Sequence, residues 1–163
     1  MELIRRTVLV LCVALLLPGC LNWRGPHHPA AGAELVAVGS AIEAWTAAGR
    51  EEPAGPRCEP LSRVEVVIVA PYPEGRSPCV YIEEDVRLYG AACMRVVQPH
   101  VGAPATLAIY LDESLDERGR QNGIAHEVLH FARSCVMRDV DRLHEDTELW
   151  GGILSDAHRR LAQ

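Results

Sequence analysis

Apolar and polar positions along this chain change between helical and strand-like spacing, which predicts a fold that contains both helices and strands. The segment Ala33–Ala48 places Leu35, Val38, Ile42 and Trp45 at helical spacing, and Gly49 follows as a helix-ending residue. Arg50–Ser62 contains three prolines and a glycine and is expected to be a loop.

Four later segments have the character of strands. Arg63–Ala70 is β-branched and almost wholly apolar, which is typical of a buried strand. Weaker patterns cover Cys79–Glu83 and Ala92–Val97, and a stronger one covers Thr106–Leu111.

The longest helical pattern runs from about Leu115 to Val136. Its start resembles a capping box, with Ser114 as the cap and Glu117 reaching back to it. An apolar stripe along this helix is formed by Ile124, Val128, Phe131, Ala132 and Cys135. A last helix is expected within Thr147–Leu161, interrupted by the pair Gly151-Gly152.

The long helix also carries the sequence His126-Glu127-Val128-Leu129-His130. Because successive residues of an α-helix are rotated by about 100°, His126 and His130 lie about 40° apart on one face, one turn from each other. Two imidazoles in this arrangement can bind one Zn²⁺ at about 2.0–2.1 Å each. We expect this face to lie opposite the apolar stripe, over a cleft, with Glu127 within reach of a metal-activated water.

The N-terminal residues have the features of an export signal. Arg5 and Arg6 precede the apolar run Thr7–Leu17, which is shorter than the roughly 20 residues that span a bilayer. The ending Leu17-Pro18-Gly19-Cys20 resembles a bacterial lipobox, although the proline departs from its commonest form. This resemblance implies that residues 1–19 are a signal peptide, that Cys20 carries lipid, and that residues 20–33 form a tether.

The lipobox resemblance indicates where the protein is located, and the length and charge of the chain indicate its organisation and partners. The lipobox implies the bacterial cell envelope, and in a Gram-negative cell the outer membrane or the periplasmic face. The remaining residues, 34–163, are enough for one domain, which we expect to be monomeric. The chain has a net charge of −6 and no basic stripe, so nucleic acid is not an expected partner.

Four cysteines follow the tether: Cys58, Cys79, Cys93 and Cys135. An even number in an exported domain indicates disulfides, and three pairings are conceivable. We favour Cys79–Cys93, because these residues flank an expected hairpin, and Cys58–Cys135 by elimination.

The HExxH sequence on a helix that follows a strand resembles the zincin superfamily of metallopeptidases. The metzincin branch continues this motif with a glycine and a third histidine, but here Arg133 and Val136 occupy those positions. The segment from His144 to Trp150 still resembles the stretch that follows the third histidine, displaced by an insertion. The resemblance therefore implies one Zn²⁺ held by His126, His130 and His144. Glu148 or Glu145, as in the gluzincin branch, and Asp146 are the alternatives for the third ligand.

The same resemblance implies an α+β fold. A mixed, mostly antiparallel sheet would pack on an N-terminal helix and the active-site helix, with a C-terminal helix after them. The implied activity is hydrolysis of a peptide or protein substrate by a metal-activated water, with Glu127 as the general base. In this family an edge strand before the active-site helix pairs with the substrate backbone, and Thr106–Leu111 holds that place in sequence order.

Other assignments remain open at this point. Tyr110, Tyr89 and His158 are candidate oxyanion donors, although none stands out; His158 is expected at the surface, and His100 in a loop. One rival hypothesis is a noncatalytic envelope lipoprotein with a zincin-like fold. Another is a zinc-dependent amidase that acts on the cell wall.

Overall fold

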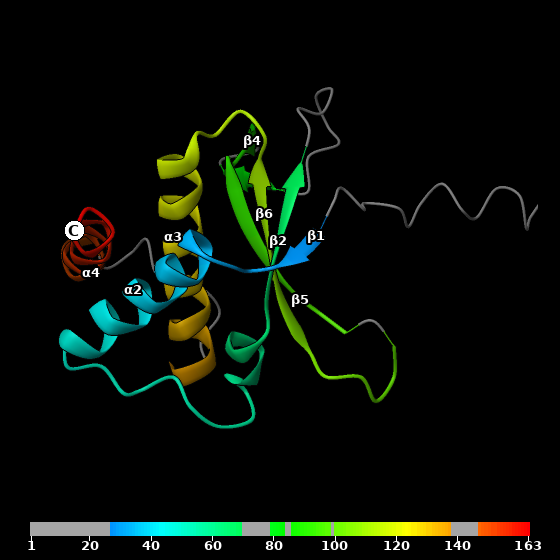
Figure 1. The fold of residues 1–163 in the computed structure, drawn as a ribbon, viewed down its shortest axis with the longest axis horizontal. Coiled ribbons are helices and arrows are strands. Elements are labelled where there is room, and N and C mark those ends of the chain that lie inside the picture. The colour runs from blue at the N-terminus through cyan, green and yellow to red at the C-terminus, as the bar shows by residue number, and fades with distance from the viewer. Residues whose placement is uncertain (1–26, 70–78, 84–85, 99, 138–146) are drawn as a thin grey trace, which may run out of the picture.

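The computed structural model describes residues 27–69, 79–83, 86–98, 100–137 and 147–163. Its main sheet has four strands in the order β1-β2-β6-β5 (Figure 1). These are β1 (His27–Pro29), β2 (Val64–Val69), β6 (Thr106–Asp112) and β5 (Ala92–Val97). The β1–β2 and β5–β6 pairs are antiparallel and the β2–β6 pair is parallel, so the expected mixed and mostly antiparallel sheet of an α+β fold is confirmed.

Three helices lie on one side of this sheet. Helix α3 (Glu117–Met137) packs on β5 and β6, α2 (Ala33–Ala47) packs on α3, and α4 (Thr147–Arg160) contacts both other helices (Figure 1). The sequence expectation for α4 is corrected in one respect, because the helix runs without interruption through Gly151-Gly152. None of the described helices combines the length and the apolar character that crossing a bilayer requires.

The main core lies between the sheet and the helices. Strand alternation directs Val66 of β2 and Leu107, Ile109 and Leu111 of β6 to the helical side, where all four are fully buried. On α2, the 3.6-residue period buries Ala37, Ala41, Ala44 and Trp45 against α3 and α4. Gly49, with a φ of 71°, follows the end of α2 as the sequence predicts.

A second hairpin lies outside the main sheet. Strands β3 (Val80–Glu83) and β4 (Val86–Tyr89) pair with each other, and the disulfide Cys79–Cys93 joins the start of this hairpin to β5. The other disulfide, Cys58–Cys135, joins the loop before the 3₁₀ helix η2 (Glu59–Ser62) to α3. Both pairings expected from the sequence are therefore confirmed.

The last residues of the segment expected as a tether, from His27 onward, are part of the fold. His27–Pro29 forms β1, and Ala30 is buried and donates its backbone N–H to the carbonyl oxygen of Val64 at 2.9 Å. Residues 1–26, which include the expected signal peptide and Cys20, lie outside the described part of the chain.

Candidate metal centre

Helix α3 carries the two histidines, and its start differs from the predicted capping box. The helix begins at Glu117, and the Asp116 carboxylate accepts the backbone N–H of Gly119 at 2.7 Å, so Asp116 is the cap. Ser114 lies before the helix, and its backbone N–H donates to the Asp112 carboxylate at 2.8 Å. A hydrogen bond from the Ser114 side chain, and after it this backbone contact, lower the pKa of Asp112.

Gly123 allows α3 to lie close to the sheet. A Cβ atom at this position would come within 3.1 Å of a Leu111 methyl group on β6 and within 3.3 Å of the Ala92 Cβ on β5. Residues three, four and seven positions further along a helix share the same side. His126, Glu127 and His130 therefore lie on the side of α3 that faces the β5–β6 half of the sheet.

The two histidine rings converge. The Nε2 atoms of His126 and His130 are 2.8 Å apart, and the ring centroids are separated by 4.6 Å. Two nitrogen ligands of one tetrahedral Zn²⁺ lie about 3.4 Å apart when each bond is about 2.1 Å long. The rings would need to separate by only about 0.6 Å to meet that geometry, so the donor atoms of this pair fit a shared metal ion.

Burial of the histidine side of α3 differs from the expectation. The apolar stripe is buried as predicted, but Glu127 and His130 are also buried, at 8% and 6% exposure, and His126 is half-buried. The physical reason is that the sheet covers the Gly123 side of α3 while α2 and α4 cover other sides. None of the three side chains is without a partner in the structure.

The third metal ligand cannot be placed among the described residues. His144, Glu145 and Asp146 lie outside them, and for Glu148 only the backbone, in the first turn of α4, is described. Within the described ranges, no three His, Cys, Asp or Glu side chains come together as a metal-binding group.

The other candidate residues of the sequence analysis are separated from the pair or differently placed. Tyr110 points to the sheet face away from the helices, where the guanidinium of Arg95 lies 5.9 Å from its ring centroid, so it is not an oxyanion donor for this centre. His100 is exposed in the loop after β5, as expected. His158 was expected at the surface, but its Nε2 is buried and has no hydrogen-bond partner among the described residues. The side chain of Tyr89 is not described.

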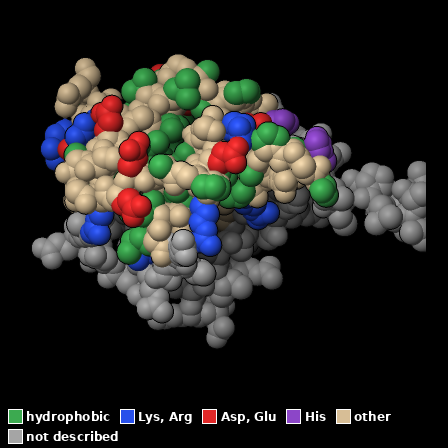
Figure 2. All heavy atoms as spheres, turned by 90° about the horizontal axis from the view of Figure 1, so that it is seen from below, with side chains coloured by type: hydrophobic (Ala, Val, Ile, Leu, Met, Phe, Trp, Pro, Cys, Tyr) green, Lys and Arg blue, Asp and Glu red, His purple; other side chains and the backbone are tan. Residues whose placement is uncertain are grey.

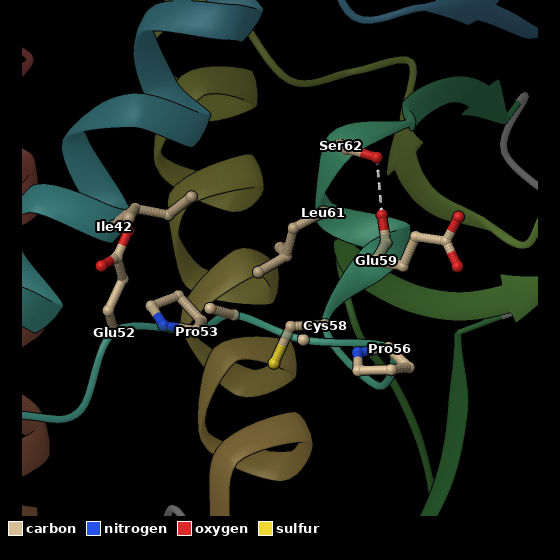
Figure 3. Close-up of a pocket in the computed structure, with 10 residues that line it drawn as sticks. Ile42, Glu52, Pro53, Pro56, Cys58, Glu59, Leu61 and Ser62 are labelled. Carbon is tan, nitrogen blue, oxygen red and sulfur yellow. Dashed lines mark hydrogen bonds between the residues drawn. The ribbon is translucent and has the colours of Figure 1, made fainter.

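A hollow of about 590 Å³ is lined by residues of α2, the following loop and η2 (Figure 3). Ile42 of α2 and Leu61 of η2 point into it, and the loop with Pro53, Pro56 and Cys58 forms its wall. The Cys58–Cys135 disulfide links this wall to α3, five residues after His130. No histidine lines the hollow, so it does not extend the candidate metal centre.

Comparisons of this chain with protein-family models, with curated proteins and with solved structures found no match. The chemistry of the site is therefore argued from its residues alone.

Proposed function

We propose that this chain is a membrane-anchored, zinc-dependent peptidase. The observation that carries the proposal is the 2.8 Å approach of the His126 and His130 Nε2 atoms on one face of α3. In this proposal His144 completes the ligand set, with Glu148, Glu145 and Asp146 as the alternatives. Cys20 holds the chain to the bacterial envelope through its lipid.

Glu127 supplies the general base. It adjoins His126 in sequence and lies on the same side of α3 as both histidines, in an environment that largely excludes bulk water. A bound Zn²⁺ would supply a lowered pKa for the attacking water and polarisation of the scissile carbonyl. The Glu127 carboxylate then accepts the proton of the attacking water and transfers it to the leaving amine.

In this proposal the substrate pairs with β5 rather than with β6. Strand β6 lies between β2 and β5, and its backbone groups are already paired on both sides, which corrects the expectation for Thr106–Leu111. Strand β5 is an edge of the sheet among the described residues.

The register of β5 defines the backbone groups that face outward. The Asp112 N–H donates to the Ala91 carbonyl, so Cys93 and Arg95 direct their backbone groups toward β6. By the alternation of an antiparallel pair, Met94 and Val96 direct theirs to the outer edge. An extended peptide substrate would pair with these groups, beside the side of α3 that carries the histidines.

A second candidate is a noncatalytic lipoprotein with a structural metal site. The burial of Glu127 and His130 favours it, because structural zinc sites are closed whereas catalytic sites keep one position open to water.

Metal content and peptide cleavage by the purified full chain test the proposal. The Glu127→Gln variant should keep about one zinc per chain and lose about 10²–10⁴-fold in cleavage rate. Glu117→Gln, an exposed change on the same helix, is the matched control and should cleave like the parent. His130→Gln should lose the zinc.

The outcomes separate the two candidates. Equal cleavage by Glu127→Gln and the parent would rule out the assigned base. One zinc per chain without cleavage by the parent of any peptide offered would favour the structural site. A chain that takes up no zinc excludes both.

A further inference from the structure

The first turn of α2 directs two large apolar side chains into solvent. Leu35 is 54% exposed and Val36 is 57% exposed, whereas Ala37 and Val38, which follow them, are buried. The exposed pair is called the Leu35–Val36 patch below. Packing of the core does not account for it, because the core side of α2 is formed by other residues.

The patch lies beside the strand at which the described chain begins. Glu34, which precedes it, accepts the backbone N–H of Ala31 at 3.1 Å and contacts the His28 Nε2 atom with both carboxylate oxygens, at 2.9 and 3.0 Å. Six residues separate Cys20 from His27, and the seven steps along the chain can span at most about 25 Å. A lipid on Cys20 would therefore keep this corner of the domain close to the bilayer surface.

Two carboxylates at this corner face histidine side chains. The Glu34 carboxylate meets His28, and the Glu65 carboxylate lies 3.5 Å from the Nδ1 atom of His27. The face seen in Figure 2 mixes acidic and basic side chains, without a broad basic patch that would attract anionic headgroups. Since the net charge of the chain is −6, contact with a bacterial membrane must come from apolar burial.

We propose that Leu35 and Val36 insert into the headgroup region of the membrane that anchors Cys20, and that they fix the orientation of the domain on the bilayer. The inference rests on the lipid anchor of the proposed function but not on its zinc chemistry. Two side chains alone would hold an unanchored protein on the bilayer only weakly. A short tether makes the contact intramolecular, with an effective concentration in the millimolar range, so a weak contact is sufficient.

Site-specific fluorescence on the lipidated full chain tests this inference. The chain is reconstituted in phosphatidylethanolamine–phosphatidylglycerol vesicles that contain brominated lipid as a quencher. An environment-sensitive dye is attached at Ala31→Cys, an exposed position at the corner, or at Val101→Cys, a fully exposed position in the β5–β6 loop. The four described cysteines are disulfide-bonded, so the introduced thiol is the one labelled.

We expect lipid to quench the dye at position 31 and not the dye at position 101. In the Leu35→Ser/Val36→Ser background the ratio of membrane-contacting to free orientations should fall about tenfold, because two half-exposed aliphatic side chains are lost. Added salt should leave the quenching unchanged, because charge does not drive the contact.

Two results would overturn the inference in distinguishable ways. If the chain floats with the vesicles but both dyes are equally quenched, or the serine variant behaves like the parent, the patch does not contact lipid. If the chain does not float with the vesicles, the lipid anchor itself is absent, and the patch proposal fails with it. Neither result bears on the proposal that His126 and His130 bind zinc.

Discussion

The two disulfides close loops of very different length, and their removal should destabilise the domain to different extents. Cys58 and Cys135 are 77 residues apart, whereas Cys79 and Cys93 are 14 apart. A cross-link stabilises the folded state mainly by lowering the entropy of the unfolded chain, and this effect grows with the logarithm of the loop length. For these lengths the expected stabilisation is about 4.5 kcal/mol for the long loop and about 3 kcal/mol for the short one.

The measurement compares two double variants, Cys58→Ala/Cys135→Ala and Cys79→Ala/Cys93→Ala. Both variants delete sulfur atoms of cysteines that are at least partly buried, so the loss of packing is similar. The difference between the two free energies of unfolding then reports the effect of loop length. Urea unfolding followed by circular dichroism should give a free energy of unfolding lower by about 1.5 kcal/mol for the first variant than for the second.

Equal stability of the two variants, or a larger loss of stability for the short-loop variant, would contradict the dependence on loop length. A changed dependence of unfolding on urea concentration would show that the unfolded states differ in compactness, and the comparison would then be repeated by thermal unfolding. Loss of the long-loop disulfide should also weaken zinc binding, because Cys135 fixes α3 five residues after His130.

Four smaller predictions concern α3, α4 and the end of β6. Gly123→Val should lower the free energy of unfolding by about 1–3 kcal/mol, because its side chain would overlap β5 and β6; Gly152→Ala, whose Cβ meets nothing within 4 Å, should raise it by about 0.5–1 kcal/mol. Asp116→Ala should cost about 0.5–2 kcal/mol by urea titration, and a larger cost for Ser114→Ala would refute the assigned cap. Asp112 has a lowered pKa in the folded state, so the ionised carboxylate stabilises the fold above about pH 4, and this stabilisation is lost as the pH falls through the lowered pKa. The difference in the free energy of unfolding between the parent and Ser114→Ala should therefore shrink over the same acid range.

Periodicity located the elements that bury a regular apolar face. The β2, β5 and β6 patterns match the observed strands closely, because strand alternation and apolar content are local properties of the sequence. The three exposed residues of β1 carry no such signal, and the strand exists because its backbone pairs with β2. Helix α4 continues through two glycines because Ile153 and Ala157 are buried against the other helices, which outweighs the low helix propensity of glycine.

For the candidate site too, local features could be predicted from the sequence and features of tertiary packing could not. The approach of His126 to His130 follows from the helix alone, since residues four apart share a face. The burial of Glu127 and the edge position of β5 could not be predicted from the sequence, because the first depends on how α3 packs on the sheet and the second on the order of the strands. Gly123 allows α3 to approach the sheet closely, but its neighbours Ala92 and Leu111 are brought there only by tertiary packing.

The half-buried position of His126 decides how a substrate could reach this centre. Glu127 and His130 are buried, so in the proposed peptidase a peptide would approach past His126, on the side of α3 that faces the β5–β6 half of the sheet. The outward backbone groups of Met94 and Val96 lie on that edge of the sheet. A proline placed at Val96 removes an outward N–H without breaking a β6 pair, whereas a proline at Arg95 removes one that β6 uses. If β5 binds substrate, Val96→Pro should impair cleavage while the fold persists; unchanged cleavage would place the substrate elsewhere and leave the closed structural site as the better account of the buried pair.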